Sequence, residues 1–212
     1  QAEDFGDLTT ILIENPKPEK RTGIHLADEE LIRGSVPMTK EEVRTVSIAK
    51  LKLTKNAVIY DVGAGTGSVS IEAALQGENL RVYAIEKNPE GAELIRKNMQ
   101  KFRADQIQVI EGVAPEALEA LEMPTHAFIG GSSGNLKEIV KLLLEKNSHV
   151  RIVINCITLE TVSEALETAK EFGFEENEIV QLSAARSKAI GRYHMMMGEN
   201  PIYIITLQNP GK

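Results

Sequence analysis

The stretch Asp61-Val62-Gly63-Ala64-Gly65-Thr66-Gly67 follows a short apolar run at residues 57–60 and precedes a segment of helical character at residues 68–76. Glycine adopts positive φ at no steric cost and lets a ligand approach the backbone closely. In open α/β sheets, ligands bind at the carboxyl ends of the parallel strands. We therefore predict a strand, a ligand-binding glycine loop and a helix, in this order.

Further apolar runs alternate with helical segments along the chain. We expect strands at residues 81–86, 107–110, 127–129, 150–154 and 201–207. We expect helices at residues 39–51, 68–76 and 88–102, and another from Pro115. Thr39 and Glu42 have the spacing of a capping box, and Asn88-Pro89 is a cap followed by proline at the first helical position. This alternation predicts an α/β fold with a doubly wound, mostly parallel sheet.

The composition narrows the class of protein. The chain has 212 residues, a formal charge of −7 and no tryptophan, whereas nucleic-acid binders usually carry a basic face and aromatic stacking residues. It contains no apolar stretch near the roughly 20 residues of a membrane span and no signal-peptide pattern. Cys156 is the single cysteine, which excludes an internal disulfide, and we expect a cytoplasmic protein. The four histidines do not stand at metal-ligand spacings, so we predict no bound metal.

The glycine spacing indicates which cofactor the loop binds. The dinucleotide fingerprint is G-x-G-x-x-G, whereas this chain has Gly63-x-Gly65-x-Gly67. This spacing resembles motif I of the class I methyltransferases that use S-adenosylmethionine (SAM), and we favour SAM over a nicotinamide cofactor. Glu86 ends the next expected strand, where a carboxylate can accept both ribose hydroxyls of an adenosine. Asp61 contacts the methionine end of the cofactor, braces the loop, or only forms the turn at the strand end.

A narrower resemblance covers about residues 23–210. It rests on stretches that occur in a fixed order: residues 36–44, 61–67, 111–117, 128–132 and 159–161, then Met195-Met196 followed by Asn200-Pro201. With these stretches the chain resembles the decarboxylating C15-methyltransferases of cobalamin biosynthesis. That family acts on precorrin or cobalt-precorrin, either alone or as the C-terminal half of precorrin-6Y C5,15-methyltransferase.

The resemblance implies a fold, an activity and a set of cofactor contacts. The fold is a Rossmann-like class I methyltransferase with an antiparallel last strand, and the activity is SAM-dependent methylation of C15 with decarboxylation of the ring C acetate. The implied cofactor-binding residues are Thr39, Asp61, Gly63, Ala64, Gly65, Thr66, Gly67, Glu86, Gly112, Val113 and Ala114. Two positions depart from the family pattern. Ala64 stands where cysteine is frequent, and Val113 stands where an acidic residue is common, so a side-chain contact to the adenine amine is lost.

The resemblance also concerns the ends and the assembly of the chain. Residues 1–22 resemble the end of a C5-methylating domain, so we expect an extension and linker at residues 1–22 and a methyltransferase domain at residues 23–212. A native tail is the alternative. The family resemblance implies a homotetramer.

Positive charge near the end of the chain fits a tetrapyrrole, because a precorrin carries many carboxylates. Arg186, Lys188 and Arg192 precede Tyr193, His194 and the run Met195-Met196-Met197. Arginine can bind carboxylates with two donors, and methionine adapts to a large apolar ring. We expect the three cations to bind substrate and name His194 as a candidate proton donor or acceptor. The alternative is a solvated hairpin with the methionines packed in the core.

The segment Gly130-Gly131-Ser132-Ser133-Gly134 follows the strand expected at residues 127–129. Its backbone N–H groups and hydroxyls would lie beside the transferred methyl group, so we expect Gly130, Gly131, Ser132 and Ser133 to bind substrate. A plain flexible loop is the alternative.

Two other functions share motif I. One is a methyltransferase that acts on RNA or a protein side chain, although RNA enzymes often carry an Asn-Pro-Pro-Tyr-type motif where this chain has Gly130-Gly131-Ser132. The other is a SAM-binding module without catalytic activity.

Overall fold

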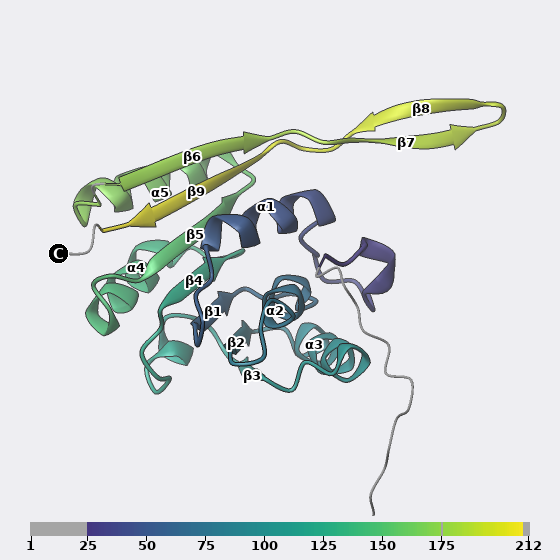
Figure 1. The fold of residues 1–212 in the computed structure, drawn as a ribbon. Helices are drawn as coiled ribbons and strands as arrows, with labels where there is room; N and C mark the ends of the chain where they lie inside the picture. The colour runs from purple at the N-terminus through teal and green to yellow at the C-terminus, as the bar shows by residue number, and fades with distance from the viewer. Residues whose placement is uncertain (1–24, 175, 210–212) are drawn as a thin grey trace, which may run out of the picture.

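A seven-stranded sheet forms the centre of the computed structural model, which describes residues 25–174 and 176–209 (Figure 1). The strand order is β3-β2-β1-β4-β5-β9-β6. The bounds are β1 (Val58–Val62), β2 (Arg81–Glu86), β3 (Ile107–Glu111), β4 (His126–Ile129), β5 (Arg151–Cys156), β6 (Glu176–Leu182) and β9 (Ile202–Gln208). The pairs among β1 to β5 are parallel, whereas β9 runs antiparallel to both β5 and β6. The predicted α/β fold with an antiparallel last strand is confirmed.

Helices cover both faces of this sheet. Their bounds are α1 (Glu41–Leu51), α2 (Ser68–Ala74), α3 (Pro89–Phe102), α4 (Leu136–Lys146) and α5 (Leu159–Glu171), with a short 3-10 helix η1 (Asp28–Glu30) before α1. Tyr60 packs in the core that contains α4 and α5, whereas Ile59 packs in the core that contains α2 and α3. Successive side chains of a strand point to opposite faces, so Asp61 lies on the same face as Ile59. This alternation aims the first residue of the glycine stretch at α2.

Three local expectations differ from the structure: the start of α1, the helix from Pro115 and the strand at the edge of the sheet. Helix α1 begins at Glu41 with Lys40 as its N-cap and without a side-chain cap bond. The predicted capping box is wrong, because Lys40 and not Thr39 is the N-cap, and the Glu42 carboxylate binds Arg186.

The helix expected from Pro115 is a 3-10 turn, η2 (Glu116–Leu118). Pro124 disfavours helix at the residue before it, which leaves only a short segment between β3 and β4. Strand β6 was not predicted, because its sequence is mostly polar; it lies at the edge of the sheet, where one side of the strand faces solvent.

A separate two-stranded hairpin extends beyond β6 and β9 and past the start of α1 (Figure 1). Its strands are β7 (Ala185–Ile190) and β8 (Tyr193–Gly198). All residues of β8 are exposed, and Met196 is 64% exposed. The interpretation of the three methionines as a core strand is therefore wrong for the single chain.

Two further expectations concern the ends and the surface. The extension at residues 1–22 and its junction with the methyltransferase domain lie outside the described residues. Within the described ranges, no helix has both the length and the apolar character needed to cross a membrane.

Candidate functional site

The glycine loop forms a close backbone junction at the end of β1. Gly63, Gly65 and Gly67 have φ values of 74°, 58° and 76°. A Cβ on Gly63 would lie 2.7 Å from the carbonyl oxygen of Gly131, and a Cβ on Gly65 would lie 2.6 Å from that of Pro37. Only glycine fits both the conformation and the space at Gly63 and Gly65. The loop after β1 therefore contacts both the loop after β4 and the segment before α1.

Glu86 connects this loop to the end of β2. Its Oε2 accepts a hydrogen bond from the Gly65 N–H at 2.7 Å, and its Oε1 accepts one from the Asn88 N–H at 2.7 Å. The side chain is mostly buried, yet it lines a cavity. Each carboxylate oxygen has two lone pairs, so both oxygens retain acceptor capacity toward a ligand. Glu86 thus lies beside the glycine loop, and its contact with the ribose of a cofactor stays a prediction.

Asp61 braces the loop from beneath. It is buried, and its Oδ2 accepts a hydrogen bond from the Ser70 hydroxyl of α2. Burial raises the pKa of the Asp61 carboxyl to about 7, and the negative charge of Glu86 contributes to the rise. Its Oδ1 has no hydrogen-bond partner among the described residues. The structure thus shows the bracing contact and leaves one buried acceptor below the loop.

These elements enclose a cavity of about 280 Å³. Most of the predicted cofactor and substrate-loop residues line it: Gly63, Gly65, Glu86, Gly112, Val113, Ala114, Gly130, Gly131, Ser132 and Ser133. The lining also includes Val36, Pro37 and Lys87, which were not predicted. The Lys87 Nζ reaches the Ser133 Oγ at 2.9 Å. Loops after β1, β2, β3 and β4 therefore converge on one site.

Five predicted cofactor residues do not line this cavity. They are Thr39, Asp61, Ala64, Thr66 and Gly67. Thr66 is fully buried, and Gly67 is the N-cap of α2. These residues shape the loop from behind, and the Thr39 carbonyl is held by Arg44.

Arg44 closes the loop of residues 26–39, which we call the clasped loop. Its Nη1 donates to the Thr39 carbonyl at 2.7 Å, and its Nη2 donates to the Leu26 carbonyl. The same guanidinium pairs with Glu72 at 2.6 Å and Asp28 at 3.2 Å, and all three side chains are fully buried. One side chain thus joins both ends of a loop that brings Val36 and Pro37 to the cavity wall.

The sequence offered no local signal for this role of Arg44. Its partners are Leu26, Asp28 and Glu72, which lie in other elements of the fold. Spacing within a motif cannot reveal such contacts.

Arg186 lies at the base of the hairpin and contacts the chain's own carboxylates. Its Nη2 and Nε donate to the Glu42 carboxylate at 2.6 Å and 3.1 Å, and its Nη1 lies 3.3 Å from Asp28 Oδ2. The hydrogen bonds from Arg186 lower the pKa of the Glu42 carboxyl. Arg186 therefore links the hairpin to α1 and to the clasped loop.

The other predicted cations lie farther along the hairpin. Lys188 is paired with Met195, and His194 with Ala189. The Arg192 guanidinium stacks on Tyr193 at 5.0 Å from the ring centroid. Lys188, Arg192 and His194 are exposed and line neither the 280 Å³ cavity nor its neighbour. In one chain, the structure does not bring them to the glycine loop.

The neighbouring cavity has a volume of about 320 Å³ and lies at the ends of β4 and β5. Residues 130–133 line both cavities. The walls also contain Asn155, Thr158, Thr161 and Glu164, which sequence reasoning missed. Asn155 lies near the carboxyl end of β5, so the strand-end rule could have indicated it.

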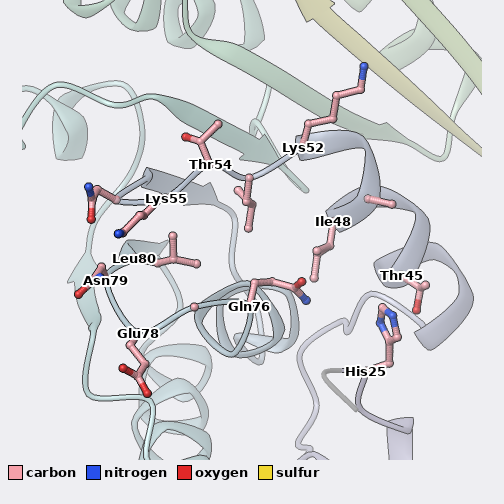
Figure 2. Close-up of a pocket in the computed structure, with 14 residues that line it drawn as sticks. His25, Thr45, Ile48, Lys52, Thr54, Lys55, Gln76, Glu78, Asn79 and Leu80 are labelled. Atoms are coloured by element: carbon pink, nitrogen blue, oxygen red, sulfur yellow. The ribbon is translucent and has the colours of Figure 1, made fainter. Parts of the chain in front are cut away.

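A larger cavity of about 620 Å³ lies at the opposite, amino-terminal end of the strands (Figure 2). Leu80 and Ile48 contribute apolar surface, while His25, Thr45 and Asn79 lie around it (Figure 2). None of the predicted site residues lines it. Since parallel α/β sheets bind ligands at the carboxyl ends of their strands, volume alone does not make this cavity the functional site.

The fold, the glycine loop and the acidic strand end define a class I SAM-dependent methyltransferase. Residues 31–209 match the precorrin methyltransferase domain, and the chain belongs to this family. A probable cobalt-precorrin-6B C(15)-methyltransferase (decarboxylating) from Pyrobaculum calidifontis is 43% identical over 173 residues, which cover 81% of this chain and 88% of the relative.

Two solved structures agree with this family. Precorrin-6y C5,15-methyltransferase from Geobacter metallireducens superimposes with a TM-score of 0.83 at 38% identity, covering 88% of this chain and 100% of that one. Precorrin 8W decarboxylase from Methanobacterium thermoautotrophicum gives a TM-score of 0.80 at 38% identity, with 86% and 98% coverage.

Proposed function

We propose that this protein methylates C15 of a precorrin or cobalt-precorrin with SAM and removes the ring C acetate carboxylate as CO2. The observation that carries the proposal is the junction of Gly63, Gly65 and Glu86 at the end of β1, in a chain that belongs to the precorrin methyltransferase family. The names of its relatives, which include a C15-methyltransferase and a decarboxylase, support both halves of the reaction.

The residues around the 280 Å³ cavity fit SAM. Glu86 would accept the ribose hydroxyls, and Val113 and Ala114 would pack against the adenine. The glycines let the ligand approach the backbone closely, and Asp61 braces this loop from behind through the Ser70 hydroxyl. When bound, SAM supplies an activated methyl group on a sulfonium. The task of the chain is then to align the acceptor carbon, and such positioning supplies about 7–11 kcal/mol of a reaction barrier.

The acceptor would lie beside residues 130–133, which separate the two cavities. Their short side chains let a flat ring approach the donor pocket. We propose that Lys188 and Arg192 bind carboxylates of the tetrapyrrole. Arg186 is proposed with them, although a substrate carboxylate would have to displace Glu42 from it. A proton-transfer role for His194 stays a prediction.

The hairpin also supports a proposal about assembly. Ile190, Tyr193 and Met196 expose 48%, 61% and 64% of their surface, and an isolated two-stranded hairpin is only marginally stable in water. We propose that the hairpin packs against another copy of the chain in a homotetramer, which would also bring its cations near a second active site. The link to a C5-methylating domain and the cytoplasmic location stay predictions.

Incubation of the protein with SAM and cobalt-precorrin-6B or precorrin-6B tests the function. We expect one methyl group transferred and one CO2 released per tetrapyrrole, detected by mass spectrometry and CO2 trapping. Glu86→Ala should weaken SAM binding in calorimetry without unfolding the protein, with Glu111→Ala as a control at the end of β3. SAM binding without methyl transfer to either tetrapyrrole would contradict the proposal and favour another acceptor or a binding module.

A further inference from the structure

The 320 Å³ cavity combines an apolar floor with a wall that it shares with the proposed donor pocket. Its floor is apolar and includes Ile129, Leu136 and Ile154. It shares residues 130–133 with the proposed donor pocket. A group inside it would therefore lie on the acceptor side of the wall, next to the place of methyl transfer.

The lining of this cavity carries negative charge, whereas a site that binds carboxylates tightly would carry positive charge. None of the residues that line it, all within the described part of the chain, is lysine, arginine or histidine. Glu164 of α5 is its one acidic side chain and is partly buried. No hydrogen bond or ion pair from a described residue engages the Glu164 carboxylate. The negative charge of Glu164 therefore faces the cavity, and no described residue pairs with it as a cation.

Glu164 also lies close to the end of β5. The pKa of the buried Cys156 thiol is raised to about 11, first by burial and then by the charge of Glu164. Cys156 is the last residue of β5, and Asn155 beside it lines the cavity. Glu164 thus lies near the carboxyl end of β5, whose residues Ile154 and Asn155 line the cavity.

The rim of the cavity suits the face of a macrocycle. Ile157 lines the cavity and is 61% exposed, and Leu159, which begins α5 two residues farther along the chain, is 72% exposed. A tetrapyrrole is too large for the cavity itself, so one ring substituent would enter while the ring rests on these apolar side chains. The hydroxyls of Thr158 and Thr161 bond to each other at 3.1 Å and do not supply charge.

We propose that this cavity receives the acetate side chain that is lost, and that Glu164 promotes its departure as CO2. This inference rests on the proposed function. A carboxylate held against the apolar floor of this cavity, beside a second negative charge and without a cation in the lining, is unstable relative to neutral CO2. The rest of the macrocycle supplies the binding energy that holds it there, because contacts remote from the reacting bond can be used to destabilise the bound ground state.

The step balances without an external oxidant or reductant. Methyl transfer leaves one positive charge on the macrocycle. The bond between the acetate methylene and its carboxylate then breaks, CO2 leaves, and the electron pair of that bond neutralises the ring. The exocyclic methylene takes up a proton to become a methyl group, and C15 releases its own proton. The negative charge of Glu164 acts on the cleavage of the bond to the carboxylate and not on methyl transfer or on the proton transfers.

Glu164→Gln and Glu164→Lys test the inference in single turnovers that follow methyl transfer and CO2 release separately. Removing a like charge should slow CO2 release at least about tenfold, while methyl transfer stays unchanged and the methylated, carboxylate-bearing product accumulates. Absorbance titration of cobalt-precorrin-6B without SAM should show binding that tightens from wild type to Glu164→Gln to Glu164→Lys. A residue that only supports the fold would weaken binding instead.

Glu167→Gln is the matched control, since Glu167 lies one helical turn farther along α5, is exposed and does not line the cavity. It should leave both rates and the binding unchanged. Equal rates of CO2 release in wild type and Glu164→Gln, or weaker tetrapyrrole binding in Glu164→Gln, would overturn the inference. If the wild type transfers no methyl group, the proposed function fails before the variants are compared.

Discussion

The clasped loop and the β7–β8 hairpin both depend on guanidinium groups, but the two regions place them in opposite surroundings. Arg44 is fully buried and bonds to four groups of its own chain. Arg192 is exposed and stacks on Tyr193. A buried guanidinium must have its charge matched by the fold. Arg44 therefore holds the clasped loop against the 280 Å³ cavity, whereas the exposed Arg192 retains donors for a partner or substrate.

Arg44→Met provides the largest test of this difference. It leaves Glu72 and Asp28 buried without their main partner, and breaking a buried ion pair costs about 3–5 kcal/mol of unfolding free energy. Urea denaturation measures the loss. Arg192→Met is the control and should change the unfolding free energy by less than about 1 kcal/mol. A similar, small change in unfolding free energy for both variants would show that the two arginines do not differ in their contribution to stability.

Gly63→Ala tests the close backbone junction of the glycine loop with the loop after β4. The added Cβ would lie 2.7 Å from the Gly131 oxygen at a φ of 74°, so the loop must shift and SAM affinity should fall at least about tenfold. Gly173→Ala is matched in backbone conformation, with a φ of 66° and no atom within 4 Å of the added Cβ. It should retain full SAM affinity in calorimetry. Normal binding by Gly63→Ala would show that the loop has room to relax.

Asp61 should make the stability of the protein depend on pH. Its folded-state pKa of about 7 lies above the ordinary 3.8, so the folded protein favours the protonated carboxyl. This contribution to stability is full below about pH 3.8 and is lost as the pH rises toward 7. Asp61→Asn should remove that part of the pH dependence in thermal unfolding between these values. An unchanged profile would show that another group causes it.

Lys188→Ala and Arg192→Ala should have the smallest effects. Each removes an exposed charge, so we expect the tetrapyrrole KM to rise by about twofold to tenfold, with unchanged SAM affinity and stability. Steady-state kinetics with cobalt-precorrin-6B measures the change. Lys141→Ala, an exposed lysine on α4, is the control. A loss of SAM affinity without a change in the tetrapyrrole KM would show that these residues act in cofactor binding and not in substrate binding.

The sequence predicts the parts of the site that depend on local order. The glycines and Glu86 follow consecutive strands, and parallel strands bring their carboxyl ends to the same edge, so their proximity follows from the fold class alone. The clasp of Arg44 and the charge of the second cavity arise from residues in separate elements, and no spacing rule connects them. The Thr39–Glu42 box failed in part for the same reason, since Arg186, 144 positions away in the sequence, binds the Glu42 carboxylate.

The wall of residues 130–133 between the two cavities has a consequence for inhibitor chemistry. Two of its residues are glycines, and a Cβ on Gly131 would meet no atom within 4 Å, so a thin linker could pass over it. A bisubstrate compound with an adenosyl group on one side and a neutral, CO2-sized tip on the other would engage both cavities at once. The same compound with a carboxylate tip should bind less tightly, and the ratio of the two affinities would measure how strongly the second cavity repels negative charge.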